Sequence, residues 1–180
     1  MMIKKCVAIA LLSGTAVLQA GFFSVGTGYN FTQEDVTKGS AAVTEIKHNS
    51  LSANIAYNQS LSDRWRVTAG FNVNSPYQKN NTGMNAKSSI GLFVFPSYKL
   101  SKKVYMRAGV IYKKTDFHDQ ATDVSIRAPR FSVGVSRGLT SNLAGTVWVG
   151  LTPEKSKTVS GVDYKIKSKS LSLGLIYSFI

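Results

Sequence analysis

Eight segments of this chain alternate apolar and polar residues with a period of two, and no other feature limits its fold so strongly. The last segment, LSLGLIYSFI at residues 171–180, places an apolar or aromatic side chain at every odd position from Leu171 to Phe179. Because successive side chains of a β-strand point to opposite faces, this segment predicts a strand with one apolar face. A terminal strand exposes an unpaired edge, so we expect it to close a sheet against another strand.

The first twenty residues have the three parts of a secretory signal peptide. Two lysines form the basic head, an apolar run extends to Leu18, and Ala20 is the small residue at the expected cut. We therefore predict a signal peptide over residues 1–20 and one mature domain over residues 21–180. The only cysteine, Cys6, lies in the signal, so the mature chain is expected to fold without a disulfide.

The mature chain repeats with a period of 39 residues. Leu61, Leu100 and Leu139 are spaced at this interval, and each is followed by a few polar residues typical of a tight turn. Each repeat unit reads as an alternating strand, a polar segment of a dozen or more residues, and a second alternating strand. Four such units predict eight strands, and no segment shows a helical period.

The two faces of these strands differ in polarity. One face is apolar in every strand, and the other carries mostly serine, glycine, asparagine and threonine. An apolar outside and a polar inside are typical of a transmembrane β-barrel, whose closure leaves no backbone group unpaired in lipid. The predicted fold is therefore all-β, an eight-stranded antiparallel up-and-down transmembrane barrel. A soluble carrier, the alternative, would have to bury Leu51, Ile55, Val67, Val94 and Val133 inside.

Aromatic residues gather near the strand ends, as in the two interfacial girdles of membrane barrels. Tyr57, Trp65 and Tyr98 lie toward the tight turns, whereas Tyr29 and Tyr112 lie toward the longer polar segments. We expect the tight turns and both chain ends to face the periplasm. Four long loops would then face outward.

The C-terminal segment carries a more specific resemblance. Its order of residues is polar, any, Gly, any, any, aromatic, any, aromatic, with Gly174, Tyr177 and Phe179 at the defining positions. On this pattern the whole mature chain resembles the small eight-stranded outer-membrane barrels of the OmpA/OmpX/Ail type. The resemblance implies a Gram-negative outer membrane, and it implies that the three residues are read by the barrel-insertion machinery. The chain departs from the pattern by ending in Ile180.

Arg66 and Arg107 are the charged residues that the alternation places inside the barrel, and no acid is expected on an inward strand position. An unpaired buried charge is costly, so these arginines should be hydrated or should pair with anions. One interpretation is a narrow anion-preferring pore. The other is a wet but closed interior, because eight strands leave little space once side chains fill the lumen.

The chain is strongly basic, with 22 Lys and Arg against 9 Asp and Glu. In an exported protein this charge favours lipopolysaccharide phosphates or a host sulfated glycan as partners, and not nucleic acid. Lys165, Lys167 and Lys169 extend the lipid-facing stripe of the last strand upward. We expect these three lysines to contact lipopolysaccharide or another anionic ligand; an ordinary solvated rim is the alternative.

Two histidines suggest chemistry without a complete motif. His48 and Ser50 share an inward face near the outer rim, and lipid A deacylases of similar fold combine a histidine and a serine with a glutamate. Only Glu45 lies near in sequence, so a rim histidine is the favoured interpretation. His118, with Asp116 and Asp119, has the loose spacing of a solvated loop and not that of a closed metal site.

The sequence therefore predicts no catalytic residues, no cofactor and no metal. The first functional hypothesis is a monomeric, non-enzymatic surface protein that presents four loops for adhesion or for membrane integrity. The first alternative is a narrow anion-preferring channel or porin that uses Arg66 and Arg107. The second alternative is a lipid A-modifying enzyme.

Overall fold

The computed structural model describes residues 21–76, 84–119 and 122–179 of the chain. The predicted signal peptide and Ile180 lie outside the described residues. The described part forms eight β-strands: β1 (Phe22–Lys38), β2 (Thr44–Ser60), β3 (Trp65–Pro76), β4 (Met84–Lys99), β5 (Val104–Asp119), β6 (Thr122–Gly138), β7 (Leu143–Val159) and β8 (Val162–Phe179). In these residues there is no helix long and apolar enough to cross a bilayer.

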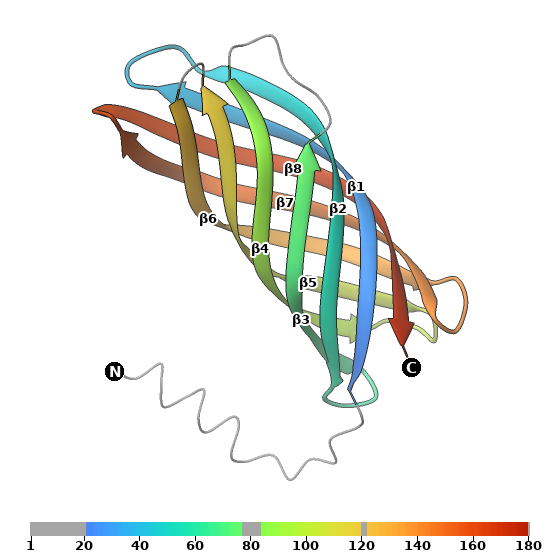
Figure 1. Cartoon of the computed structure of the whole chain (residues 1–180). Coiled ribbons are helices and arrows are strands. Elements are labelled where there is room, and N and C mark those ends of the chain that lie inside the picture. Colours follow the sequence, from blue (N-terminus) through green and yellow to red (C-terminus); the bar gives the residue numbers. More distant parts are fainter. Residues whose placement is uncertain (1–20, 77–83, 120–121, 180) are drawn as a thin grey trace, which may run out of the picture.

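Each strand pairs antiparallel with its sequence neighbour, and β8 returns to pair with β1, so the sheet closes into a barrel (Figure 1). The closing ladder runs from Phe23 opposite Phe179 to Lys38 opposite Tyr164. It holds the terminal strand along almost its whole length. The prediction of an eight-stranded, up-and-down, antiparallel barrel is confirmed.

The outer wall carries the apolar stripe that the alternation predicts. Leu92 and Val94 of β4 are 55% and 52% exposed, and Ile55 and Phe71 on the neighbouring strands are 52% and 56% exposed. Side chains of this kind are stable in contact with lipid, and the closed ladder satisfies the backbone there. The wall is therefore that of a transmembrane barrel.

Ring pairs mark the two ends of this apolar belt. Phe23 packs edge-on against Tyr57, and Trp65 against Tyr98, with ring centroids 5.3 and 5.0 Å apart, at the end that holds the tight turns. Tyr29 and Phe31 form a similar pair, 4.9 Å apart, toward the opposite end. Aromatic rings of this orientation suit the boundary between lipid and water.

The strands are longer than the sequence analysis predicts. The polar segments expected as long loops continue as paired β-structure in the β1–β2, β5–β6 and β7–β8 hairpins. β7 and β8 are joined by a two-residue turn at Ser160 and Gly161, whose φ angles of 52° and 78° suit the turn type that matches strand twist. The expectation of four long loops is therefore wrong for these hairpins, which project as ribbons of sheet (Figure 1).

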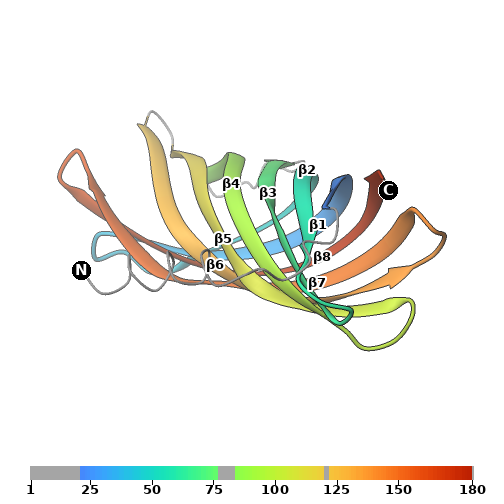
Figure 2. The same cartoon turned by 90° about the horizontal axis from the view of Figure 1, so that it is seen from below.

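Above the apolar belt, the closed wall divides into two sheets. The β6–β7 ladder ends at Phe131 opposite Leu151, although both strands continue beyond this pair. In the same register the next outward positions are Pro129 and Pro153, and proline has no N–H to donate to a ladder. The outer ends of β6 and β7 stand apart in both views (Figures 1 and 2), although Lys157 Nζ on β7 donates a hydrogen bond to the Ser125 carbonyl oxygen on β6 at 2.8 Å.

The two sheets, β7-β8-β1-β2 and β4-β5-β6, pack face to face through an apolar cluster at the outer end of the lumen. We call this cluster the apolar cap. Phe117 and Val124 from the second sheet are at most 1% exposed, and Ile46 from the first is equally buried. The apolar cap consists of Val36, Ile46, Phe117, Val124, Ile126, Tyr164 and Ile166. It fills the inside of the barrel with side chains that exclude water.

Replacing Phe117 with alanine should loosen the extracellular sheets while leaving the membrane barrel closed. Removing a buried phenylalanine costs about 3–5 kcal/mol, and here that loss falls on the apolar cap. We expect faster trypsin cleavage and faster amide exchange in the β5–β6 and β7–β8 hairpins. The matched control is Phe131→Ala, on the outward face at 54% exposure; equal effects of the two changes would contradict a packed cap.

Candidate functional site

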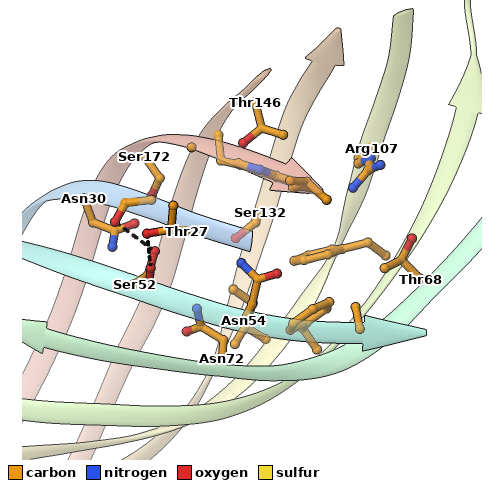
Figure 3. A pocket seen from close by; sticks show the side chains of 18 of the residues that line it. Thr27, Asn30, Ser52, Asn54, Thr68, Asn72, Arg107, Ser132, Thr146 and Ser172 are labelled. Atoms are coloured by element: carbon orange, nitrogen blue, oxygen red, sulfur yellow. Dashed lines mark hydrogen bonds between the residues drawn. The ribbon is translucent and has the colours of Figure 1, made fainter. Parts of the chain in front are cut away.

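The middle of the barrel encloses a cavity of about 100 Å³, which we call the lumen cavity (Figure 3). Its wall is mostly polar on the side of β1 to β4, where amides and hydroxyls form a hydrogen-bonded chain. Asn30 donates to the Ser50 hydroxyl at 3.3 Å and to the Asn74 side-chain oxygen at 3.2 Å. Asn74 in turn donates to Asn72 at 2.8 Å and to Ser89 at 2.9 Å. This network fixes the polar wall across four neighbouring strands.

Aromatic side chains from β4 and β7 narrow the lumen beside the cavity. Phe93 and Phe95 stack with ring centroids 5.0 Å apart, and Phe95 also packs against Trp148 at 4.6 Å. Ala56 and Ile111 complete this second apolar group. These three aromatic side chains therefore occupy part of the lumen.

The two arginines selected from the sequence both point inward, but they have different surroundings. The Arg66 guanidinium lies between the rings of Phe22 and Tyr105, 4.8 and 5.0 Å from their centroids. Arg107 is only 7% exposed and lines the lumen cavity. Among the described residues, the Nε of neither arginine has a hydrogen-bond partner.

A belt of four ionisable side chains lies between the lumen cavity and the apolar cap. We call Glu34, His48, Lys113 and Arg130 the charge belt. All four are at most 8% exposed, and they line a small shared pocket. Glu34 Oε2 lies 3.4 Å from His48 Nε2. A carboxylate beside buried cations offsets part of their charge.

The charge belt corrects the expectation that no acid lies on an inward strand position. Glu34 is inward because β1 continues to Lys38, so the even positions of this strand keep facing the lumen after the apolar stripe ends. Lys113 and Arg130 were missed for the same reason on β5 and β6. Following the period of two beyond the last apolar position would have found all three.

The structure brings a glutamate to His48 and Ser50 without forming a catalytic group. Glu34 supplies the carboxylate that the sequence analysis lacks. In the described part of the chain, however, neither ring nitrogen of His48 has a hydrogen-bond partner, and the Ser50 hydroxyl accepts from Asn30. A nucleophile needs a base within hydrogen-bond reach. Both side chains are also buried in the lumen, away from lipid.

The lysines selected on β8 face outward, as the alternation predicts. Lys167 Nζ lies 3.5 Å from Asp35 Oδ2 on β1. Lys169 lies between two grooves in the outer wall, of about 460 and 540 Å³. The first groove includes Phe31 and Leu171, and the second Phe131 and Leu151. Lys169 therefore has apolar residues of the outer wall beside it in both grooves.

The residues of the C-terminal signature take the positions that a closing strand requires. Tyr177 and Phe179 lie on the outward face, with ring centroids 5.2 Å apart. Gly174 pairs with Gly28 of β1, and a Cβ at Gly174 would lie 2.8 Å from the Thr27 carbonyl oxygen. Glycine is therefore needed there for the close approach of β1 and β8. The role of this segment as an insertion signal stays a prediction.

His118 lies on β5 and not in the solvated loop expected from the sequence. Its Nδ1 is 2.7 Å from Asp123 Oδ1 on β6, and Lys87 Nζ lies 2.8 Å from the same carboxylate. Hydrogen bonds from Lys87 and His118 lower the pKa of Asp123. The side chain of Asp119 lies outside the described residues, and the described ones contain no group of three metal-ligating side chains. The contacts join β4, β5 and β6 at the rim.

No family model and no curated protein matches this sequence. Solved structures do match. Neisserial surface protein A has a TM-score of 0.61 at 17% identity, over 89% of this chain and 100% of that one. Ail of Yersinia pestis has a TM-score of 0.53 at 15% identity over the same shares. OprG of Pseudomonas aeruginosa has 0.50 at 13% identity, over 90% and 97%.

This chain has the fold of the small outer-membrane barrels. The matched structures share its eight-stranded architecture, whereas the charge belt, the lumen cavity and the apolar cap are described from this chain's own residues. At such low identity the likeness carries no residue role from one protein to another. The function has to be argued from the sites themselves.

Replacing Glu34 with glutamine should destabilise the barrel markedly. The change leaves Lys113 and Arg130 buried beside His48 without a carboxylate, and breaking a buried charge pair from one side costs about 3–5 kcal/mol. Urea unfolding of the refolded protein in lipid would measure this loss. Glu45→Gln is the control, because Glu45 is exposed and its partner Lys47 lies in solvent. Equal stability of the Glu34 variant and the wild type would show that the acid does not hold the charge belt.

Proposed function

We propose that this protein is a non-enzymatic outer-membrane protein of Gram-negative type that presents a rigid extracellular surface to anionic ligands. The observation that carries the proposal is the apolar cap, because it fills the lumen where a channel would need a wet path. The same packing stiffens the projecting hairpins. A surface held by two packed sheets binds with little loss of conformational freedom.

The proposed working surface is the outer part of the β7–β8 hairpin and its neighbour β1. Lys165, Lys167 and Lys169 are exposed on β8, and Lys155 and Lys157 are exposed on β7. Lys169 lies beside apolar residues of the outer wall, and the other lysines continue outward from it, which supports a contact with lipopolysaccharide phosphates. A phosphate or sulfate beside several ammonium groups forms charge-assisted hydrogen bonds. The arrangement supports lipopolysaccharide as the membrane partner and a sulfated glycan as an external one.

A comparison supports the second partner class. Ail of Yersinia pestis, at 16% identity and a TM-score of 0.53, has been solved in complex with the heparin analogue sucrose octasulfate. That complex concerns Ail itself. For the present chain the argument rests on the exposed lysines of the β7–β8 hairpin, which offer the same kind of charge to a polysulfated ligand.

A triple change of Lys165, Lys167 and Lys169 to glutamine should weaken retention of lipopolysaccharide, because it removes three positive charges near the phosphates. Co-purification of lipopolysaccharide with the barrel, quantified by mass spectrometry, measures the effect. The matched control is Lys99, Lys102 and Lys103 to glutamine, which removes three lysines at the end with the tight turns. Unchanged retention in the β8 variant would remove this partner.

The absence of conductance is a separate expectation. The mature protein, refolded into a planar bilayer, should give no steady single-channel openings because the apolar cap and the aromatic group obstruct the lumen. Insertion is verified independently by protease protection. Steady openings that prefer anions, and lose that preference when Arg66 and Arg107 become glutamine, would replace this proposal with the channel hypothesis. Altered lipid A in cells that make the protein would favour the enzyme hypothesis instead.

A further inference from the structure

We propose that the lumen cavity, whose wall includes Arg107 and Arg130, binds one small inorganic oxyanion of the phosphate or sulfate class. The starting observation is an imbalance of charge inside the barrel. Among the described buried side chains below the apolar cap, the cations Arg107, Lys113 and Arg130 face a single acid, Glu34.

Among the described residues, no carboxylate lines the lumen cavity beside Arg107 to balance its charge. Arginine stays protonated in proteins, so it cannot lower its charge as a buried lysine does. Arg66 has the faces of two aromatic rings beside it. Glu34 lies in the charge belt, with His48 and Lys113 in the same pocket. Arg107 is 7% exposed, its Nε has no hydrogen-bond partner in the described structure, and it faces the lumen cavity.

The lumen cavity has the chemistry that an oxyanion requires. Both Arg107 and Arg130 line it, and no carboxylate is among the described residues that line it. Hydroxyl and amide side chains line the same cavity as Arg107, and they can donate to several oxygens of one ligand (Figure 3). These groups belong to Asn54, Thr68, Asn72, Ser132 and Thr146.

The size and the surroundings of the cavity favour an ion over a few ordered waters alone. A volume of about 100 Å³ is several times what a single water needs. Phe93, Phe95 and Trp148 form part of the wall, so water is partly excluded and attraction between opposite charges is stronger than in bulk solvent. A guanidinium group can donate two parallel N–H hydrogen bonds to two oxygens of one oxyanion.

Gly150 fixes the place of Arg130. A Cβ at this position would lie 2.3 Å from Arg130 Nε and 2.7 Å from one of its terminal nitrogens. The guanidinium therefore lies against the bare backbone of β7. Gly150→Ala would displace the guanidinium from this position without changing any charge, which separates the geometry of the site from its electrostatics.

The experiment uses the refolded mature protein and radiolabelled inorganic phosphate in equilibrium dialysis, with a large organic sulfonate as the only other anion. We expect one phosphate per barrel. Arg107→Gln and Arg130→Gln should each weaken binding about tenfold or more, since each removes a positive charge from the wall of the cavity. Gly150→Ala should weaken binding as well. Arg127→Gln, on the exposed outer face, is the control and should leave binding unchanged.

Thermal unfolding distinguishes variants that bind phosphate less tightly from variants that fold poorly. Without phosphate, the Arg107→Gln variant should be at least as stable as the wild type, because it lacks a buried charge with no carboxylate near it. The Arg107→Gln Arg130→Gln double variant also removes a cation beside Glu34, so its Tm is measured to show that it still folds. Phosphate should raise the Tm of the wild type and of Arg127→Gln more than that of the double variant, whereas a general salt effect would be equal in all three. Absence of stoichiometric binding, binding that survives the double change, or equal competition by chloride would overturn the proposal. Bilayer conductance is a separate measurement, so failure of this site is distinguishable from failure of the proposed function.

Discussion

Closure of the backbone ladder is the constraint on which the rest of this structure depends. In lipid, an unpaired N–H or C=O has no water to bond, so a sheet that crosses the bilayer has to return to its first strand. Here β8 meets β1 from Phe23–Phe179 to Lys38–Tyr164. Once the wall is closed, alternation assigns every residue to lipid or to the lumen. The polar wall, the aromatic group and the buried cations are all consequences of that assignment.

The lumen shows how such a barrel fills its interior without a conventional hydrophobic core. Amide and hydroxyl groups hydrogen-bond to one another along β1 to β4, and aromatic rings from β4 and β7 fill another part of the lumen. Positive charge is held in two ways, by ring faces at Arg66 and by a carboxylate near Lys113 and Arg130. At the outer end the side chains become apolar and the interior is dry. The proposed function accordingly relies on the outward residues of the β7–β8 hairpin.

The sequence was sufficient for the barrel, its strand order and its lipid-facing stripe, because lipid contact enforces a strict period of two. It failed above the membrane, where the phase of the pattern inverts. On β1 the apolar positions are odd up to Phe31, but the next buried apolar residue is Val36. On β5 they are even up to Tyr112, and then Phe117 is buried. If apolar residues are expected only at the outward positions, these outer segments have the composition of polar loops.

The same inversion explains what was missed in the lumen. Glu34, Lys113 and Arg130 lie in the interval between the two phases, where neither face is apolar and the strand pattern is weakest. Arg66 and Arg107 were found because they lie between positions of apolar stripes that were already recognised. The lysines of β8 were found because they continue the outward parity of Leu171. Which ligand meets them depends on shape and charge in three dimensions, and no period in the sequence encodes that.

The facing prolines also bear on the mechanical strength of the wall. The β6–β7 ladder extends only from Phe131 to Gly138 on β6, whereas the seam between the two chain ends extends from Phe23 to Lys38 on β1. Each paired residue resists separation of neighbouring strands, so the shorter ladder is the weaker one. Under a force applied across the wall, this barrel would part between β6 and β7, in the middle of its sequence, while its two chain ends stay joined.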